Sequence, residues 1–173
     1  MHTPVLRLYR SRFGRRPAAI EDLAADGSQR RYWRLVGPDG STVVGAFGPE
    51  NEENRAFLAF SRAFRSIDLP VPEIYADDEE AGAWLMEDLG DTTLYDALRA
   101  ARVESGERFP GTIEETYRRV VETLPRFQVE GHRVVDYDLA YPHAAFDRRS
   151  ILWDLNYFKY HFLKLAHVSF HDA

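Results

Sequence analysis

The stretch of residues 30–47, RRYWRLVGPDGSTVVGAF, decides the fold class of this chain. Apolar and polar residues alternate on both sides of Pro38-Asp39-Gly40. This tripeptide is typical of a turn, because proline fixes its φ angle and glycine tolerates a positive one. The pattern predicts two strands, 30–36 and 41–47, joined by a hairpin, and the same period of two predicts an earlier strand over 19–25.

Helices and two further strands are predicted around this hairpin. A first helix is expected to begin at Thr3-Pro4 and to end at Gly14. A second is expected over 51–66, with acidic residues in its first turn and an aliphatic and aromatic stripe formed by Phe57, Phe60, Phe64 and Ile67. Short strands over 73–76 and 83–87 follow. No connection is long enough for repeated parallel crossovers, so we expect an α+β fold with a mostly antiparallel five-stranded sheet.

The remainder of the chain is predicted to be helical. Thr93 and Asp96 form a capping pair for a short helix through Ala101, and Thr112-Ile113-Glu114-Glu115 reads as a capping box for a helix over 112–129 that Pro125 should kink or shorten. Residues 150–166 are apolar on every face, as expected of a buried helix. The chain offers little further sequence to cover them, so we predict a homodimer through residues 150–166.

Composition excludes several classes of function. The net charge of −6, with arginines interspersed among acids, argues against a nucleic-acid partner. The absence of cysteine excludes disulfides and thiolate sites. No apolar run is long enough for a membrane span and no signal-peptide pattern opens the chain. We therefore expect a cytoplasmic location and no membrane partner.

Two segments carry chemistry that could bind a nucleotide. Gly27 and Ser28, between two strands, would let main-chain N–H groups approach a phosphate, and Arg30 and Arg31 offer planar cations to the same anion. The segment 86–90, MEDLG, could present main-chain groups to an adenine edge while Met86 and Leu89 cover the ring. Each segment alone is equally compatible with an ordinary turn. No metal site is expected, since His167 and His171 at helical spacing have no supporting glutamate.

Taken together, these segments resemble the aminoglycoside phosphotransferase-like family, also called the phosphotransferase enzyme family, and within it the sugar-kinase-like branch. The resemblance covers roughly residues 19–100 and is carried by 27–35, GSQRRYWRL, by 69–75, LPVPEIY, and by 85–91, LMEDLGD. It implies a protein-kinase-like amino-terminal lobe over residues 1–90, followed by the helical beginning of an incomplete second lobe over 91–173.

The resemblance also implies roles for particular residues. The loop 26–32 would lie over the phosphates of ATP, and Glu52 or Glu53, with Glu53 preferred, would take the place of the helical glutamate. The adenine hinge would be formed by Glu87, Asp88 and Leu89, with Met86 before them. The phosphate-binding residues would be Gly27, Ser28, Gln29, Arg30 and Arg31. The stretch 136–156 would lie near the acceptor.

Two departures from the family pattern bear on activity. The strand 41–47 has no lysine for the α- and β-phosphates, so either Arg30 or Arg31 substitutes for it or nucleotide affinity is poor. No His-Gly-Asp or His-Arg-Asp triplet followed by asparagine is present. We therefore expect the amino-terminal portion of an ATP-dependent small-molecule phosphotransferase, inactive as it stands, with no catalytic residue here and magnesium only in a complete enzyme. The alternative is a non-catalytic nucleotide-binding or protein-interaction module. The sequence does not identify the acceptor.

Overall fold

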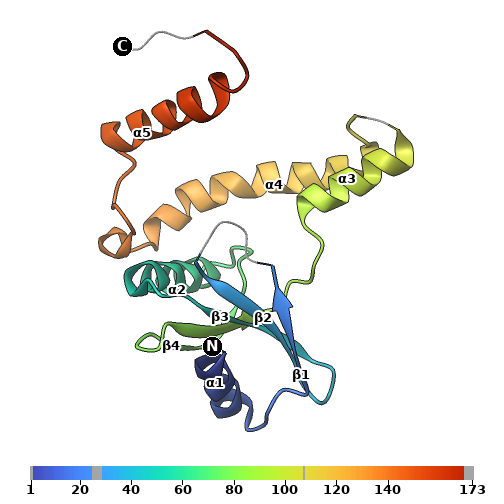
Figure 1. The fold of residues 1–173 in the computed structure, drawn as a ribbon, viewed down its shortest axis with the longest axis vertical. Coiled ribbons are helices and arrows are strands. Elements are labelled where there is room, and N and C mark those ends of the chain that lie inside the picture. Colours follow the sequence, from blue (N-terminus) through green and yellow to red (C-terminus); the bar gives the residue numbers. More distant parts are fainter. Residues whose placement is uncertain (1, 25–28, 107, 170–173) are drawn as a thin grey trace. The chain divides into compact units, whose positions relative to one another are not determined.

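An antiparallel sheet of five strands forms the centre of the larger of the two units into which the chain divides, Met1–Asp136 and Tyr137–Ala173 (Figure 1). The computed structural model describes residues 2–24, 29–106 and 108–169. Within these ranges the fold is α+β, with five strands and five α-helices, as the sequence predicts. The functional boundary at residue 90 stays a prediction.

The sheet has the strand order β1-β2-β3-β5-β4, and every neighbouring pair is antiparallel. Its strands are β1 Ala19–Leu23, β2 Arg31–Val36, β3 Thr42–Phe47, β4 Ile74–Asp78 and β5 Ala83–Glu87. The predicted turn joins β2 and β3, with Gly40 at φ +79° and its N–H donating to the Gly37 carbonyl at 3.0 Å. The mostly antiparallel five-stranded sheet expected from the sequence is confirmed.

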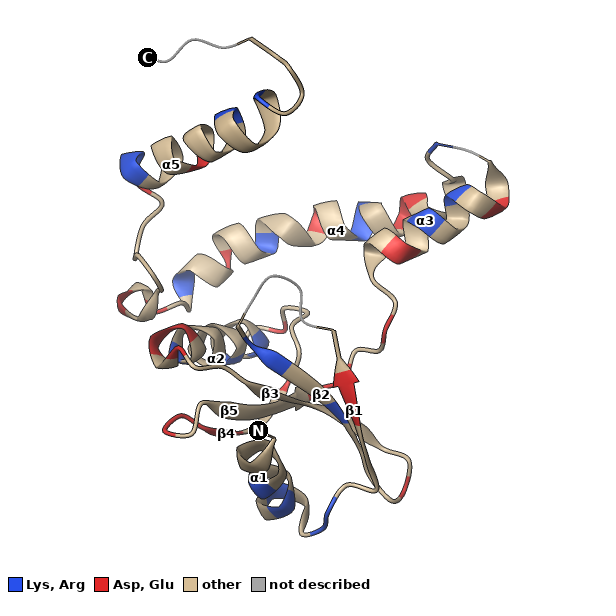
Figure 2. Cartoon of the chain, viewed as in Figure 1, with Lys and Arg blue, Asp and Glu red and all other residues tan. Residues whose placement is uncertain are grey.

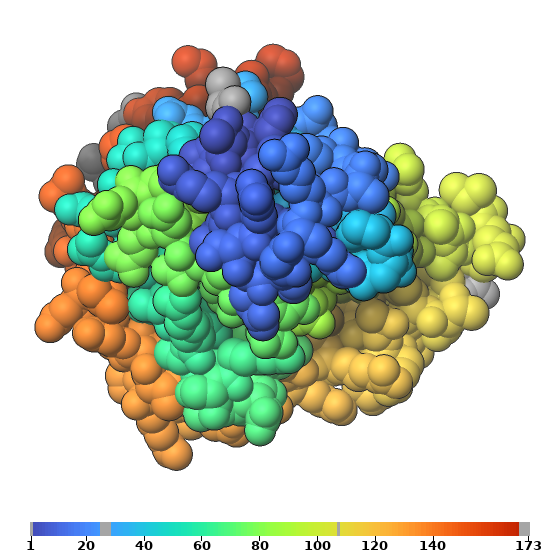
Figure 3. Space-filling view, turned by 90° about the horizontal axis from the view of Figure 1, so that it is seen from below, coloured from blue at the N-terminus to red at the C-terminus, as the bar shows by residue number. Residues whose placement is uncertain are grey.

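Helix α1, Thr3–Phe13, covers one face of this sheet and faces the viewer in Figure 3. Its Val5 and Tyr9 are buried against Trp33, Leu35 and Leu85 from three different strands of the sheet or their neighbours. Gly45 on β3 is required by this close approach, because a Cβ there would lie 2.2 Å from a methyl group of Val5. The helix therefore closes an apolar core on its side of the sheet.

Helix α2, Asn51–Arg65, packs on the opposite face. Its Leu58 is buried with Ala46 of β3 and Trp84 of β5, and Phe57 and Met86 pack around them. Glu52 and Glu53 lie in the first turn, as predicted. The predicted aromatic stripe is only half-buried, and the fully buried positions of the helix are Asn54, Ala56, Leu58 and Ser61.

Helices α3, Leu94–Ser105, and α4, Gly111–Val129, depart from the sequence prediction at their ends. Thr93 caps α3 as expected, but this helix continues beyond Ala101 to Ser105. Helix α4 has Pro110 at its N-cap and makes no side-chain cap hydrogen bond, so the capping box at 112–115 was wrong. It also continues past Pro125 to Val129, because a proline removes one N–H donor without preventing the next turn when the other hydrogen bonds hold. A short 3-10 helix, Gly131–Arg133, follows.

The second unit contains a 3-10 turn, Tyr137–Leu139, and helix α5, Arg148–Phe158, which continues as a π-helical stretch, Lys159–Leu163. The expected apolar helix is present, but its expected burial is wrong for the single chain, because no residue among the described positions 137–169 is buried. None of the described helices is both long and apolar enough to cross a membrane.

Candidate functional site

A cavity of about 350 Å³ lies between the start of β2 and the first turn of α2. An ion pair forms part of its wall, with Nη2 of Arg30 2.9 Å from Oε1 of Glu53. The same Nη2 donates to the Glu53 carbonyl at 3.3 Å. Acidic side chains in a first turn are favoured by the helix dipole, and here one of them also fixes a cation. The cavity is lined by Gln29, Arg30, Gly48, Pro49, Glu50, Glu53 and Asn54.

Two aromatic rings hold the Arg30 side chain from below. Its guanidinium carbon lies 5.1 Å from the centre of the Phe57 ring and 5.4 Å from that of Trp84. The side chain is only 13% exposed. A guanidinium stacked on aromatic rings and paired with a carboxylate has little rotational freedom left to lose on binding an anion. Arg30 is thus pre-organised beside the cavity.

The other residues predicted for the phosphate loop divide into three groups. Gly27 and Ser28 lie outside the described residues. Gln29 lines the cavity beside Arg30. Arg31 begins β2 opposite Phe47, is exposed and does not line the cavity. The structure therefore separates the two arginines that the sequence left as alternatives.

Asn54 is a buried member of the cavity wall that sequence reasoning missed. It is 3% exposed, and its Nδ2 donates to the Gly48 carbonyl at 2.8 Å. Its Oδ1 is buried without a hydrogen-bond partner in the described part of the chain. Its position in α2, one residue after Glu53, could have suggested a role, but no local motif marks it.

The predicted hinge residues lie at the end of β5 and just beyond it. Met86 packs beside Trp84 on the face that α2 covers. The Glu87 N–H donates to the Glu73 carbonyl at 2.8 Å, which extends the pairing of β5 with the β4 side of the sheet. Leu89 is 69% exposed. Among the described residues its main-chain N–H and C=O take part in no hydrogen bond.

Asp88 is held by a contact that the sequence did not predict. Its carboxylate accepts two hydrogen bonds from Arg34 of β2, at 2.6 Å from Nε and 3.0 Å from Nη2. This guanidinium also donates to Asp91, at 3.1 and 2.8 Å. The bonds from Arg34, with further bonds from the Gly90 N–H and the Thr42 hydroxyl, lower the pKa of Asp88 to about 2. The carboxylates of Asp88 and Asp91 are therefore engaged by the protein itself.

The sheet register brings both halves of the candidate site to one face. Tyr32, Ala46 and Trp84 are lateral neighbours on β2, β3 and β5, and Arg34, Val44 and Met86 form the next row in that direction. Successive side chains of a strand alternate between faces, so both rows point to the face of α2. Arg30 and residues 86–91 thus border one continuous surface of unit 1. Figure 2 shows the acidic strand β1 beside the basic positions of β2.

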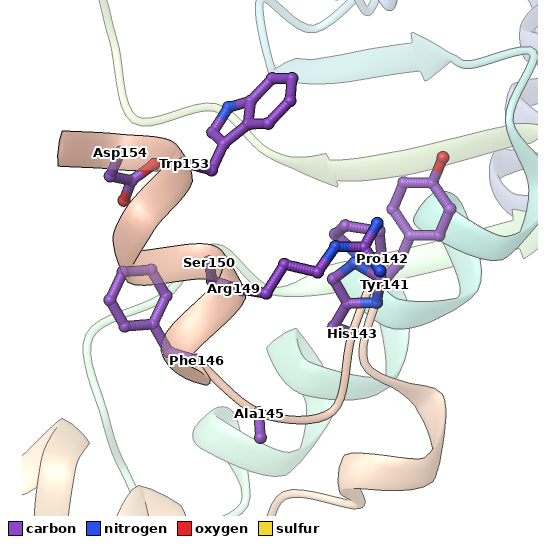
Figure 4. A pocket seen from close by; sticks show the side chains of 9 residues that line it. All are labelled: Tyr141, Pro142, His143, Ala145, Phe146, Arg149, Ser150, Trp153 and Asp154. Carbon is purple, nitrogen blue, oxygen red and sulfur yellow. The ribbon is translucent and has the colours of Figure 1, made fainter. Parts of the chain in front are cut away.

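A second cavity, of about 590 Å³, lies within the second unit, in the stretch 136–156 predicted to be near an acceptor. In Figure 4 the Arg149 side chain extends toward Tyr141, Pro142 and His143, whereas Trp153 points away from them. No group of three histidine or acidic side chains arranged for a metal ion occurs in residues 2–24, 29–106 and 108–169. Acceptor binding at this cavity stays a prediction.

Sequence comparison relates part of this chain to sugar kinases. It is 33% identical over 112 residues to the N-acetylmuramate/N-acetylglucosamine kinase of Pseudomonas aeruginosa, which is 65% of this chain and 30% of that protein. The protein of the same name from Pseudomonas putida is 37% identical over 89 residues, 51% of this chain and 26% of the relative. That of Neisseria meningitidis is 31% identical over 86 residues, 49% of this chain and 25% of the relative.

The chain therefore spans less than a third of the length of each of these relatives. No family model matches it. The relatives support a kinase-like family of phosphotransferases. The narrower resemblance to aminoglycoside phosphotransferases stays a prediction.

Proposed function

We propose that this chain is the ATP-binding, amino-terminal portion of a phosphotransferase that acts on a hydroxyl group of an amino sugar or related small molecule. The Arg30–Glu53 ion pair beside the cavity of unit 1 carries the proposal. Protein kinases use a lysine on strand three, paired with a helical glutamate, to hold the α- and β-phosphates. Here β3 has no lysine, and Arg30 supplies the cation from the start of the neighbouring strand.

Arg30 suits this role because its guanidinium can donate to two phosphate oxygens in one plane. Glu53 would orient it, and the rings of Phe57 and Trp84 would keep it at the cavity wall. Adenine would lie further along the same face, with its edge against the main chain of Glu87 and Leu89 and its ring against Met86. The sugar-kinase relatives support an amino sugar as the acceptor.

Magnesium is expected only in a complete enzyme. The described part of the chain gathers no three acidic or histidine side chains suited to hold it. The sequence also lacks the His-Gly-Asp type of triplet that supplies a catalytic aspartate. Because positioning and charge neutralisation provide nearly all the catalysis in phosphoryl transfer, we expect no turnover by this chain alone. A coupled ADP-release assay with amino sugars tests this, and turnover that co-elutes with the protein would contradict it.

Binding of ATP is tested by calorimetric titration of the wild type and two neighbouring variants. Arg30→Met should weaken ATP binding by about one to two decades, because one charge-assisted phosphate contact is worth about 1.5–3 kcal/mol. Arg31→Met is the matched control, since Arg31 is exposed and outside the cavity, and should leave affinity within about twofold. Equal losses in both variants, or no binding by the wild type at millimolar ATP, would overturn the proposed function.

The second candidate function is a non-catalytic module that binds a nucleotide or a protein. The observation that favours it is the exposed apolar side of α5, where Trp153 is 73% exposed. Amide-shift titration distinguishes the two candidates. ATP should perturb Arg30 and Leu89 first if unit 1 is a nucleotide-binding lobe, whereas shifts confined to residues 148–163 would favour the module.

A further inference from the structure

Arg34 makes the densest set of charged contacts in the described part of unit 1. Its four hydrogen bonds join it to both carboxylate oxygens of Asp88 and both of Asp91. Glu21 of β1 lies beside it, with Oε2 3.9 Å from Nη1. The Arg34 side chain is 14% exposed and that of Asp88 6% exposed. Planar pairs of N–H donors matched to carboxylates are geometrically specific, and their partial burial protects them from screening.

The segment that these contacts hold has little else to hold it. Residues 88–93 form neither helix nor strand between β5 and α3. Gly90 has φ +82°, and its N–H donates to Oδ1 of Asp88 at 3.0 Å, so the chain turns there. Arg34 therefore fixes the segment on both sides of Leu89, by Asp88 before it and by Asp91 after it. Segments with few hydrogen bonds of their own open readily when such anchors are lost.

Leu89 lies between the two anchors with its main-chain groups unused. The anchored segment continues directly from Met86 and Glu87 of β5, and Arg34, Val44 and Met86 share one row of the sheet. An adenine placed against that row would meet the main chain after Met86. A purine offers adjacent donor and acceptor atoms along one edge, which is the pattern that an extended main chain can match.

We propose that Arg34 is the positioning residue of a purine-binding segment: by anchoring Asp88 and Asp91 it presents the main-chain N–H and C=O groups of Leu89 to the edge of an adenine. This inference rests on the proposed function and assigns the adenosine half of the ligand to residues 86–91. Arg30 then serves the phosphate half. Arg34 contacts no ligand itself, so its effect should be confined to nucleosides.

The test compares ligands that contain one half each. Arg34→Lys keeps the charge but loses the planar pair of donors, and it should weaken adenosine and ATP binding by about tenfold, the equivalent of one misplaced hydrogen bond. Inorganic tripolyphosphate, which has no purine, should bind Arg34→Lys and the wild type within about twofold of each other. Arg30→Met should show the opposite pattern, with tripolyphosphate affected and adenosine spared.

A second variant and a ligand-free measurement protect the test against misfolding. Asp91→Asn removes one anchor at a side chain that is 75% exposed, so the fold should tolerate it. In the absence of nucleotide, amide exchange at Leu89 to Asp91 should accelerate in both Arg34→Lys and Asp91→Asn, while exchange in β3 stays unchanged. If both variants bind adenosine as the wild type does, or lose tripolyphosphate equally, the positioning role is overturned. If the wild type binds neither ATP nor tripolyphosphate, the proposed function is overturned and the inference with it.

Discussion

The two units of this chain solve the problem of burial in opposite ways. In unit 1 both faces of the sheet are covered, by α1 on one side and α2 on the other, and side chains such as Leu85 and Trp84 are fully buried. In unit 2 the described residues include none that is buried, although α5 is at least as apolar as any strand. Apolar sequence alone therefore does not produce a core. It requires a second layer at the right distance, which Gly45 permits in unit 1 by letting α1 approach.

The largest expected effect comes from making the same substitution in both units. Leu85→Ala should lower the free energy of unfolding by about 3 kcal/mol, because it removes a fully buried side chain and leaves a cavity. Leu155→Ala in α5 should change it by no more than about 0.5 kcal/mol, because Leu155 is exposed. Chemical denaturation at high dilution measures both. Comparable losses would show that α5 is covered in the folded protein and would break the contrast between the units.

The next prediction concerns pH and the Arg34 contacts within unit 1. The pKa of Asp88 is lowered to about 2 from an ordinary value near 3.8. A carboxyl group whose pKa is depressed on folding stabilises the fold fully above its unfolded pKa, and this contribution is lost as the pH falls toward the folded pKa. Between about pH 4 and pH 2 we expect Asp88 to account for about 2 kcal/mol of lost stability.

Denaturation curves for the wild type and Asp88→Asn across this pH range isolate the contribution. The variant is expected to be less stable at neutral pH, since Arg34 loses a charged partner, but its stability should fall less steeply on acidification. Parallel pH profiles for the two proteins would show that the Arg34–Asp88 contact does not stabilise the fold.

A smaller effect is expected at the junction between the sheet and the helices that follow it. The Thr93 hydroxyl accepts a hydrogen bond from the Asp96 N–H at 3.1 Å and caps α3. Thr93→Ala should cost about 1 kcal/mol. Thr112→Ala is the matched control, because α4 makes no side-chain cap hydrogen bond and its N-cap is Pro110. Thermal unfolding followed by circular dichroism should separate the two variants, and an equal loss in both would restore the capping box at 112–115.

These elements also show what the sequence could and could not reveal about the fold. The β2–β3 hairpin was predictable because its turn chemistry is local, with Pro38, Asp39 and Gly40 adjacent in sequence. The start of α4 was not, because two caps competed within a few residues and the proline preceded the threonine. Burial of α5 was not predictable at all, since the residues that would cover it lie elsewhere in three dimensions.

The candidate site divides in the same way. Sequence reasoning placed a cation near residue 30 and a carboxylate at Glu53, and the structure joins Arg30 to Glu53 and sets Arg31 aside. Arg34 lay within the stretch that suggested the family, but its partner Asp88 is 54 positions away. Such a pair becomes visible only when β2 and β5 are placed on either side of β3. Asn54 was missed because a single buried amide leaves no periodic signal.

The smallest effect on folding, and the sharpest test of the contrast, is expected from the exposed aromatic residues of α5. Trp153, Phe158 and Phe162 are all exposed, and the rings of Phe158 and Phe162 stack with centres 5.1 Å apart. Covering apolar surface is favourable by about 25 cal/mol per Å², so we expect two copies of the chain to associate through residues 150–166. If the dimer is twofold, the same residues contact each other from both copies.

Light scattering at several concentrations should therefore find a dimer or larger species for the wild type and a monomer for the Trp153→Ser, Phe158→Ser double variant. The stability of unit 1 should differ between them by no more than about 0.5 kcal/mol at high dilution, since neither side chain belongs to its core. A wild-type monomer whose three aromatic side chains are protected from solvent would show that the chain covers α5 itself. Both the predicted homodimer and the contrast between the two units would then be wrong.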